Sequence, residues 1–443
     1  MNPSPNALAQ ALTLPCGATL PNRLMKSAMT EGLAGPDGRA NERHNRLYQA
    51  WSEGGTGLLV TGNVMVDYRY LERPGNIVVD GNGGEEELRA LAKAGTVNGN
   101  HLWMQISHPG RQCSMISNSK PMAPSEVKLK MMAYFAKPRA MTEADIQKAI
   151  ADYVRVAGIA KATGFTGVQI HGAHGYLLSQ FLSPVVNKRD DQWGGSIENR
   201  ARLLLEVVRG VRAEVGADYP IGVKLNSADF QKGGFTLEES QQVAGWLSEE
   251  KIDLLEISGG TYEQLRLIGR KGNENEADEP ELDTRRESTK QREAYFLEYA
   301  QAIQDAINIP LAVTGGFRSC ESMVAAVENK ELDVIGLARP LCTQPDIANK
   351  LMNNEIEQCP DDENHLQIGK GWLGPNSNIN LIKTLNAQAT VAWFYRQIIQ
   401  LSKGEPIRPN LSAFKALNEH FPEEIAMGLA RRKALKKQGR SLT

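Results

Sequence analysis

Cysteines are few and far apart in this chain of 443 residues. The five thiols belong to Cys16, Cys113, Cys320, Cys342 and Cys359. This spacing predicts neither a disulfide framework nor a cysteine-ligated metal site, and it suits a reducing compartment. We therefore expect a cytoplasmic protein that binds no metal ion.

The sequence also lacks any apolar run of the roughly 18 residues that a membrane span needs. Its first residues contain no basic segment leading into an apolar core, so they do not resemble a signal peptide. The formal net charge is only −2, which gives no global attraction to nucleic acid or to a membrane surface. We expect a globular protein whose partner is a small molecule, with neither nucleic acid nor membrane involved.

One stretch departs from this charge balance. Basic residues gather between Arg431 and Arg440, with Lys433, Lys436 and Lys437 among them. A charge run of this kind is typical of a solvated tail, and a site for an anionic partner is the alternative. We predict the solvated tail.

Short apolar segments recur along the chain, and each is followed by a stretch with helical spacing. Several are rich in Val, Ile and Leu, as expected for parallel strands covered by helices. The eight strand candidates are Arg23–Ala28, Leu58–Gly62, Leu102–Ser107, Gly167–Ile170, Ile221–Asn226, Leu254–Ser258, Pro310–Thr314 and Val334–Arg339. Eight strand–helix alternations predict an α/β fold, the (β/α)8 TIM barrel.

Helical patterns separate these strands, and Thr142 is a candidate N-cap for one of them. The expected helices cover Glu85–Asn98, Glu143–Thr163, Ile197–Val215, Leu237–Glu250, Arg292–Ala306, Glu321–Glu328 and Pro345–Met352. We place the barrel in residues 1–364 and a C-terminal helical extension with a basic tail in residues 365–443. An apolar helix around Thr390–Leu401 should pack on the barrel or on a neighbouring subunit, and the second case would give a homo-oligomer.

The competing fold is an open, doubly wound sheet that binds a dinucleotide. It requires G-x-G-x-x-G between the first strand and the first helix. The first strand is instead followed by Met29-Thr30-Glu31-Gly32. The barrel is therefore the better prediction.

Two connections are much longer than the others, His108–Met141 and Gly259–Lys290. Loops of this length in a compact fold are usually lids or interfaces, and plain excursions are the alternative.

Chemistry in such a barrel lies at the carboxyl ends of the strands. Strand seven runs into Gly315 and Gly316, and strand eight ends in Ala338 and Arg339. Glycines let backbone N–H groups approach an anion, and a guanidinium adds a charged contact. This end predicts a phosphate site; loop glycines and a surface arginine are the alternative.

The most informative segment follows strand four and contains His171, His174 and Tyr176. Two imidazoles here can donate hydrogen bonds to one oxygen of a substrate, and a tyrosine can act as a general acid. A zinc site would need further ligands at matching spacing, which the sequence does not offer. Packing roles for all three residues remain the alternative.

These residues resemble the Old Yellow Enzyme family. The longest matching run is His171-x-x-His174-Gly175-Tyr176, Phe181-Leu182-Ser183-Pro184 and Asn187-x-Arg189-x-Asp191-x-x-Gly194-Gly195-Ser196-x-Glu198-Asn199-Arg200. Distant support comes from Pro21-Asn22-Arg23, Gln105-Ile106-Ser107-His108-Pro109-Gly110-Arg111 and Ala338-Arg339-Pro340-Leu341. The resemblance covers about residues 10–355.

The resemblance implies a non-covalent FMN and assigns residues to it. Residues expected along the flavin are Ser27, Ala28, Met29 and Thr30, with Thr30 near the reactive edge. Gly62 and Gln105 would meet the polar edge of the ring, and Gly315, Gly316, Ala338 and Arg339 would hold the phosphate. Many relatives have arginine where this chain has Lys224. A lysine ammonium is a point charge, whereas an arginine guanidinium can donate two parallel hydrogen bonds.

The resemblance also implies a function. His171 and His174 would bind the electron-withdrawing group of an α,β-unsaturated carbonyl or nitro compound, and Tyr176 would protonate the α-carbon of this substrate. NAD(P)H would supply the electrons in a ping-pong mechanism. The alternatives are a flavin-dependent dehydrogenase or demethylase and a non-catalytic flavin-binding sensor. Larger relatives carry a closely spaced cysteine run for an iron–sulfur cluster; the separation of Cys320, Cys342 and Cys359 predicts no such cluster.

Overall fold

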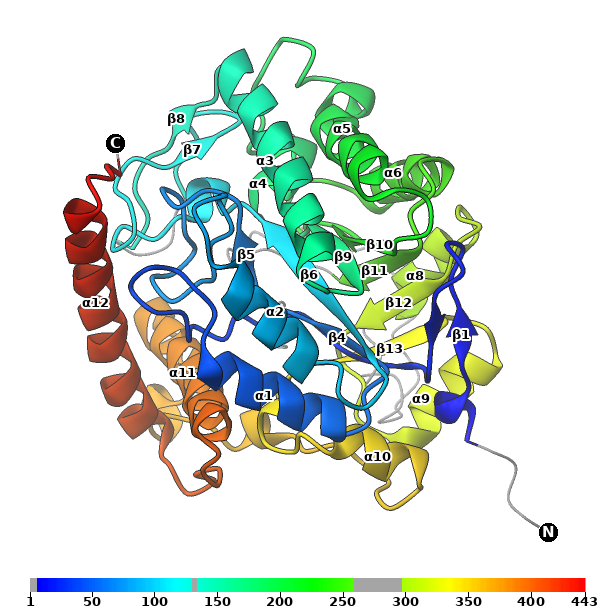
Figure 1. Cartoon of the computed structure of the whole chain (residues 1–443). Coiled ribbons are helices and arrows are strands. Elements are labelled where there is room, and N and C mark those ends of the chain that lie inside the picture. Colours follow the sequence, from blue (N-terminus) through cyan, green and yellow to red (C-terminus); the bar gives the residue numbers. More distant parts are fainter. Residues whose placement is uncertain (1–5, 130–133, 259–296, 443) are drawn as a thin grey trace.

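Eight parallel strands close into a barrel surrounded by helices in the computed structural model, which describes residues 6–129, 134–258 and 297–442 (Figure 1). In chain order the barrel strands are β3 (Leu24–Lys26), β4 (Leu58–Val60), β6 (His101–Ser107), β9 (Gly167–Gly172), β10 (Ile221–Asn226), β11 (Leu254–Ser258), β12 (Leu311–Thr314) and β13 (Val334–Leu337). The ring closes because β3 pairs with both β4 and β13. All eight predicted strands and the TIM-barrel fold are confirmed.

The floor of the barrel is apolar and is organised around Trp103 of β6, which is fully buried. Its indole leaves no room for a side chain at one position on β9 and one on β10. A Cβ at Gly167 would lie 2.4 Å from the indole Nε1, and a Cβ at Gly222 would lie 2.8 Å from the ring. The short hairpin of β1 (Leu12–Thr13) and β2 (Thr19–Leu20) adds Leu14 and Leu20 to the same apolar cluster.

Three further short strands lie outside the ring. β5 (Val64–Met65) pairs with the end of β6, and β7 (Met122–Ala123) pairs with β8 (Arg139–Ala140). The β7–β8 pair lies in the first of the two long predicted connections. The second, Gly259–Lys290, lies outside the described residues.

Helices cover the outer face of the barrel (Figure 1). They are α1 (Glu42–Glu53), α2 (Glu85–Ala94), α3 (Glu143–Ala162), α4 (Leu177–Leu182), α5 (Ile197–Val215), α6 (Leu237–Glu249), α8 (Leu297–Gln304), α9 (Cys320–Glu328) and α10 (Ile347–Met352). Thr142 caps α3, because its side chain accepts the Asp145 N–H while the Asp145 side chain accepts the Thr142 N–H. The sequence did not predict α1, whose buried apolar stripe is limited to Leu47, Tyr48 and Trp51.

Two long helices complete the chain, α11 (Asn380–Lys403) and α12 (Ala413–Lys437). They pack against each other, and α11 also packs against α1 (Figure 1). The predicted apolar helix at Thr390–Leu401 lies within α11, and it packs on the barrel of its own chain. The boundary between residues 364 and 365 and the homo-oligomer remain predictions.

The prediction of a solvated basic tail is wrong in part. Arg431 is buried on α12 and donates to the carbonyl oxygen of Tyr68. Arg440 forms an ion pair with Asp80, and its guanidinium carbon lies 3.7 Å from the centre of the Tyr68 ring. The lysines of this run are exposed, as expected. The two arginines anchor the end of the chain because the β5 loop offers them a carbonyl, a carboxylate and an aromatic face.

Among the described residues, none of the helices combines the length and the apolar composition that crossing a bilayer requires.

One buried cation lies between the barrel and α1. Lys26 of β3 is fully buried and donates from Nζ to the carbonyl oxygen of Val60 at 2.6 Å. Its ammonium lies 4.6 Å from the centre of the Trp51 ring and 5.3 Å from that of Tyr48. Burial lowers the pKa of Lys26 from 10.5 to about 8, although the charge of Glu31 opposes this shift.

This shift predicts a pH dependence of stability. Between about pH 8 and 10.5 the folded chain loses the Lys26 proton while the unfolded chain keeps it, so stability rises with pH. We expect the free energy of unfolding of the wild type, relative to Lys26→Met, to increase between pH 7 and pH 9.5. Urea unfolding at both values measures the difference, and exposed Lys93→Met is the control. A difference that stays constant with pH would contradict the assignment.

Candidate active site

The two histidines and the tyrosine predicted from the sequence come together at the carboxyl end of β9. The ring centres of His171 and His174 are 5.3 Å apart, and those of His171 and Tyr176 are 4.8 Å apart. The loop makes a sharp turn here, and His174 has a backbone φ of 59°. Positive φ in a residue other than glycine is strained, and such strain gathers at functional sites.

Hydrogen bonds constrain both imidazoles. The N–H of Ala173 donates to Nδ1 of His171 at 3.3 Å, so a neutral His171 carries its proton on Nε2. Nε2 of His174 lies 2.9 Å from the hydroxyl of Ser258, the last residue of β11. The backbone N–H of His174 donates to Oδ1 of Asn226 at 3.0 Å. The turn is therefore held by the ends of the two following strands.

Both histidines are neutral at physiological pH. Burial lowers the pKa of each imidazole well below 6.5, and the positive charge of Lys224 lowers both further. A neutral imidazole keeps one N–H donor, which is what binding a substrate oxygen requires.

Lys224 faces a carboxylate that the sequence analysis missed. Its Nζ lies 2.7 Å from Oε1 of Glu256, and both side chains are almost completely buried. The two residues are direct partners in the register of β10 and β11. A glutamate inside the apolar run Leu254–Ser258 was the available signal, because a buried charge needs a partner.

The same carboxylate links side chains from several other strands. Thr314 donates to Oε1 of Glu256 at 2.6 Å, and Gln169 donates to Oε2 at 2.6 Å. Gln105 in turn donates to Gln169 at 2.8 Å, and Ser27 lies 2.6 Å from Thr314 Oγ1. The predicted residues Ser27, Gln105 and Lys224 therefore belong to one polar layer above the apolar floor.

A second group of carboxylates lies beside β3 and β4, and the sequence analysis missed both members. Thr30 donates to Oε2 of Glu72 at 2.9 Å. The N–H of Gly62 donates to Oε1 of Glu31 at 2.8 Å, and Tyr48 donates to the same oxygen. A Cβ on Gly62 would lie 2.5 Å from the Met29 carbonyl oxygen, so this position requires glycine.

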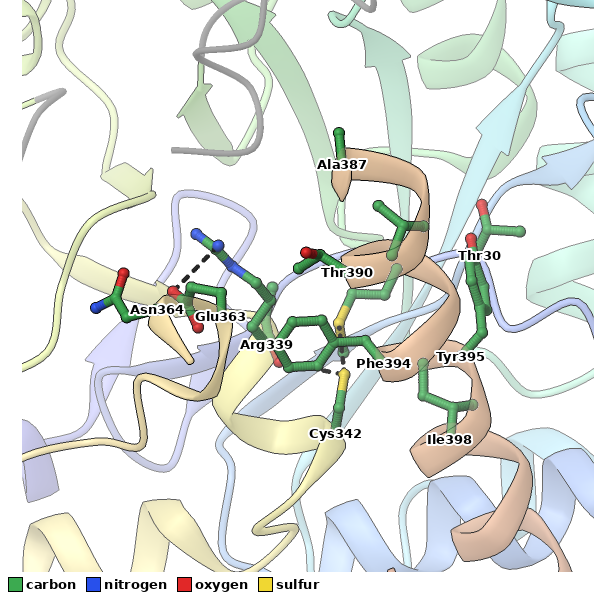
Figure 2. Close-up of a pocket in the computed structure, with 13 residues that line it drawn as sticks. Thr30, Arg339, Cys342, Glu363, Asn364, Ala387, Thr390, Phe394, Tyr395 and Ile398 are labelled. Atoms are coloured by element: carbon green, nitrogen blue, oxygen red, sulfur yellow. Dashed lines mark hydrogen bonds and ion pairs between the residues drawn. The ribbon is translucent and has the colours of Figure 1, made fainter. Parts of the chain in front are cut away.

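The predicted phosphate end carries two guanidinium groups. Arg339 lies 3.1 Å from Oε1 of Glu363 (Figure 2). Arg318 also pairs with Glu363, so the two guanidinium groups share this carboxylate. Gly315 and Gly316 have φ values of 133° and 82°, a backbone that other residues rarely adopt.

Comparison with known proteins identifies the family of this chain. Residues 12–358 match the model of the NADH:flavin oxidoreductase / NADH oxidase family. The chain belongs to this family. The resemblance to Old Yellow Enzymes is thereby confirmed, and the chain is a flavin oxidoreductase.

Fungal members of the family match over nearly the whole chain. The NADH-dependent flavin oxidoreductase iccE of Talaromyces variabilis is 34% identical, over 89% of this chain and 98% of that protein. The NADH-dependent flavin oxidoreductase nadA of Aspergillus parasiticus is 33% identical, over 94% of this chain and 89% of that protein. Both alignments therefore extend beyond the barrel.

Solved structures show the same fold. A 2-naphthoyl-CoA reductase complex has a TM-score of 0.71 and 25% identity, over 80% of this chain and 53% of that chain. An Old Yellow Enzyme homologue from Zymomonas mobilis has a TM-score of 0.66 and 22% identity, over 80% of this chain and 94% of that chain.

The site residues fit the flavin that family membership implies. Gln105 and Lys224 provide polar groups at the carboxyl end of the barrel. Gly316 and Arg339 suit a phosphate. In the part of the chain that is described, no three His, Cys, Asp or Glu side chains are placed to hold a metal ion. The absence of an iron–sulfur cluster remains a prediction.

The Lys224–Glu256 pair supports a stability prediction. Glu256→Gln leaves a buried ammonium without its counter-charge, which should cost about 3–5 kcal/mol of unfolding free energy. The double variant Lys224→Met, Glu256→Gln should lose less than the sum of the two single variants. Urea unfolding measures the free energy of unfolding of the wild type, the two single variants and the double variant.

Glu126→Gln is the control, because Glu126 forms an exposed ion pair with Lys137. It should cost less than about 1 kcal/mol. Equal losses for the Glu256 and Glu126 variants would contradict a buried, coupled pair.

Proposed function

We propose that this family member binds FMN and uses NAD(P)H to reduce the activated carbon–carbon double bond of an α,β-unsaturated carbonyl or nitro compound. The observation that carries the proposal is the cluster of His171, His174 and Tyr176 at the carboxyl end of β9. Binding a flavin requires none of these three side chains. Together they supply two hydrogen-bond donors and one acid, which is the set that reduction of an enone uses.

FMN, when bound, supplies the hydride that it has received from NAD(P)H. The chain holds the cofactor through Gln105, Lys224 and Arg339. It binds a substrate oxygen through hydrogen bonds from Nε2–H of His171 and from the imidazole of His174. Negative charge grows on that oxygen as the β-carbon gains hydride, so these hydrogen bonds strengthen in the transition state.

Tyr176 completes the addition by donating its phenolic proton to the α-carbon. The alkene thus gains one hydride and one proton, and the proton that Tyr176 loses is recovered from solvent. Nicotinamide oxidation and alkene reduction are then separate half-reactions, which is a ping-pong mechanism.

An amine dehydrogenase or demethylase is less well supported by the charges of the site. A protonated amine would need an anion or an aromatic cage near the histidines. The charged neighbour that acts on both imidazoles is instead the cation Lys224. Neutral donors next to a cation suit a substrate that develops negative charge.

The visible spectrum of the purified chain tests the proposal. We expect a yellow flavin band that NAD(P)H bleaches under anaerobic conditions and that 2-cyclohexenone restores. Acid-released flavin should be identified as FMN by mass spectrometry. A band that bleaches but does not respond to the enone would contradict alkene reduction. A colourless chain that does not take up FMN would contradict the proposal as a whole.

The role of Tyr176 can be separated from cofactor reduction. Tyr176→Phe should slow alkene reduction by about 10²–10⁴-fold because the proton donor is lost. Bleaching by NAD(P)H should be almost unchanged. Stopped-flow absorbance follows the two half-reactions separately.

Tyr219→Phe is the matched control. It removes a hydroxyl that donates to the Phe165 carbonyl oxygen at 2.7 Å, and Tyr219 precedes β10 rather than following β9. Both half-reactions should stay close to wild type in this control. Equal slowing of the two half-reactions in Tyr176→Phe would show that Tyr176 is not the proton donor.

A further inference from the structure

A cavity of about 300 Å³ lies between the barrel mouth and α11 (Figure 2). Its barrel side includes four residues that the sequence analysis assigned to the flavin and its phosphate: Met29, Thr30, Ala338 and Arg339. Its other side comes from the C-terminal part of the chain. The family model ends at residue 358, so Glu363, Asn364 and the whole α11 wall lie outside the part that defines the family.

The cavity is polar at one end and apolar along its length. Arg339, Glu363 and Asn364 form the polar end (Figure 2). The α11 wall includes Ala387, Val391, Phe394 and Ile398. Their spacing of four, three and four residues puts these side chains on one face of the helix.

The barrel side of the cavity adds a soft, apolar surface. Sγ of Cys342 lies 3.6 Å from Sδ of Met29. Burial raises the pKa of the Cys342 thiol to about 12, so this sulfur is uncharged at neutral pH. A neutral thiol and a thioether pack well against an aromatic ring.

The order of strands around the barrel relates this cavity to the polar edge of a bound flavin. Gln105 is on β6 and Lys224 is on β10, and both strands pair with β9. In the closed ring β3–β4–β6–β9–β10–β11–β12–β13, three strands lie between β9 and β13 in either direction, so the two strands stand opposite each other. A flat ring with its polar edge at Gln105 and Lys224 therefore extends its opposite edge toward β13 and β3, where the cavity lies.

We propose that α11 completes the cofactor site by enclosing the dimethylbenzene edge of FMN in this cavity. The inference rests on the proposed function, because it takes FMN as the ligand. The dimethylbenzene edge is the hydrocarbon part of the isoalloxazine, and it lies opposite the polar pyrimidine edge. The apolar α11 wall matches the dimethylbenzene edge of FMN, and the charged end of the cavity beside Arg339 matches its phosphate.

Substrate or nicotinamide is the competing occupant of the cavity. His171, His174 and Tyr176 do not line it. A reacting group must contact those residues, so the cavity belongs to the cofactor.

The test fills the cavity from the α11 side. Val391→Trp should raise the dissociation constant of FMN at least about tenfold, because the indole occupies the space of the ring edge. The flavin-loaded chain is diluted, and released FMN is measured by its fluorescence. Gln400→Trp is the matched control, because it places the same side chain about two and a half turns further along α11, on the opposite face of the helix and outside the cavity. Its dissociation constant should stay within about twofold of wild type.

A second measurement needs no substitution. The wild-type chain should bind FMN about 15-fold more tightly than 7,8-didemethyl-FMN, at roughly fourfold for each of the two buried methyl groups. In Val391→Trp this preference should be lost. Unchanged FMN affinity in Val391→Trp, or equal affinities of the wild type for the two flavins, would overturn the inference and leave the proposed function intact. A wild-type chain that binds neither flavin would refute the proposed function itself.

Discussion

A lysine and a glutamate paired inside the barrel organise the rest of the site. Removing two charges from water is costly, so Lys224 and Glu256 must remain in contact and their remaining hydrogen-bonding groups must be satisfied. Thr314 and Gln169 provide those bonds, which ties four strands to one carboxylate. The polar layer has little freedom to rearrange, and it forms a fixed base at the carboxyl end of the barrel.

The alternation of side chains along each strand explains why this layer is continuous. Residues two apart on a strand face the same way. On β6, Trp103 belongs to the apolar floor and Gln105 to the polar layer. On β11, Leu254 and Glu256 are related in the same way. The barrel interior therefore changes from apolar to polar over two residues of each of these strands. The apolar floor supports the network from below, and the network positions the Lys224 charge, which adds to the effect of burial in lowering the pKa of both histidines.

The C-terminal helices give the barrel a wall that its eight strand–helix units do not provide. α11 packs on α1, and α12 is anchored by Arg431 and Arg440 to the loop after β5. The carbonyl oxygen that Arg431 contacts and the carboxylate that Arg440 pairs with fix α12 against the barrel, and α12 in turn packs on α11. The extension thus belongs to the architecture of the mouth.

Sequence by itself determined the barrel, because eight short apolar segments alternating with helical patterns are local signals. It also determined the His171–His174–Tyr176 cluster, whose members lie within six residues on one strand end. Only the tertiary structure decided that Lys224 pairs with Glu256 and that α11 faces Arg339. Those contacts join residues at least 32 positions apart. Strand register and helix docking set such distances, and both depend on how the whole chain packs rather than on the residues of any one segment.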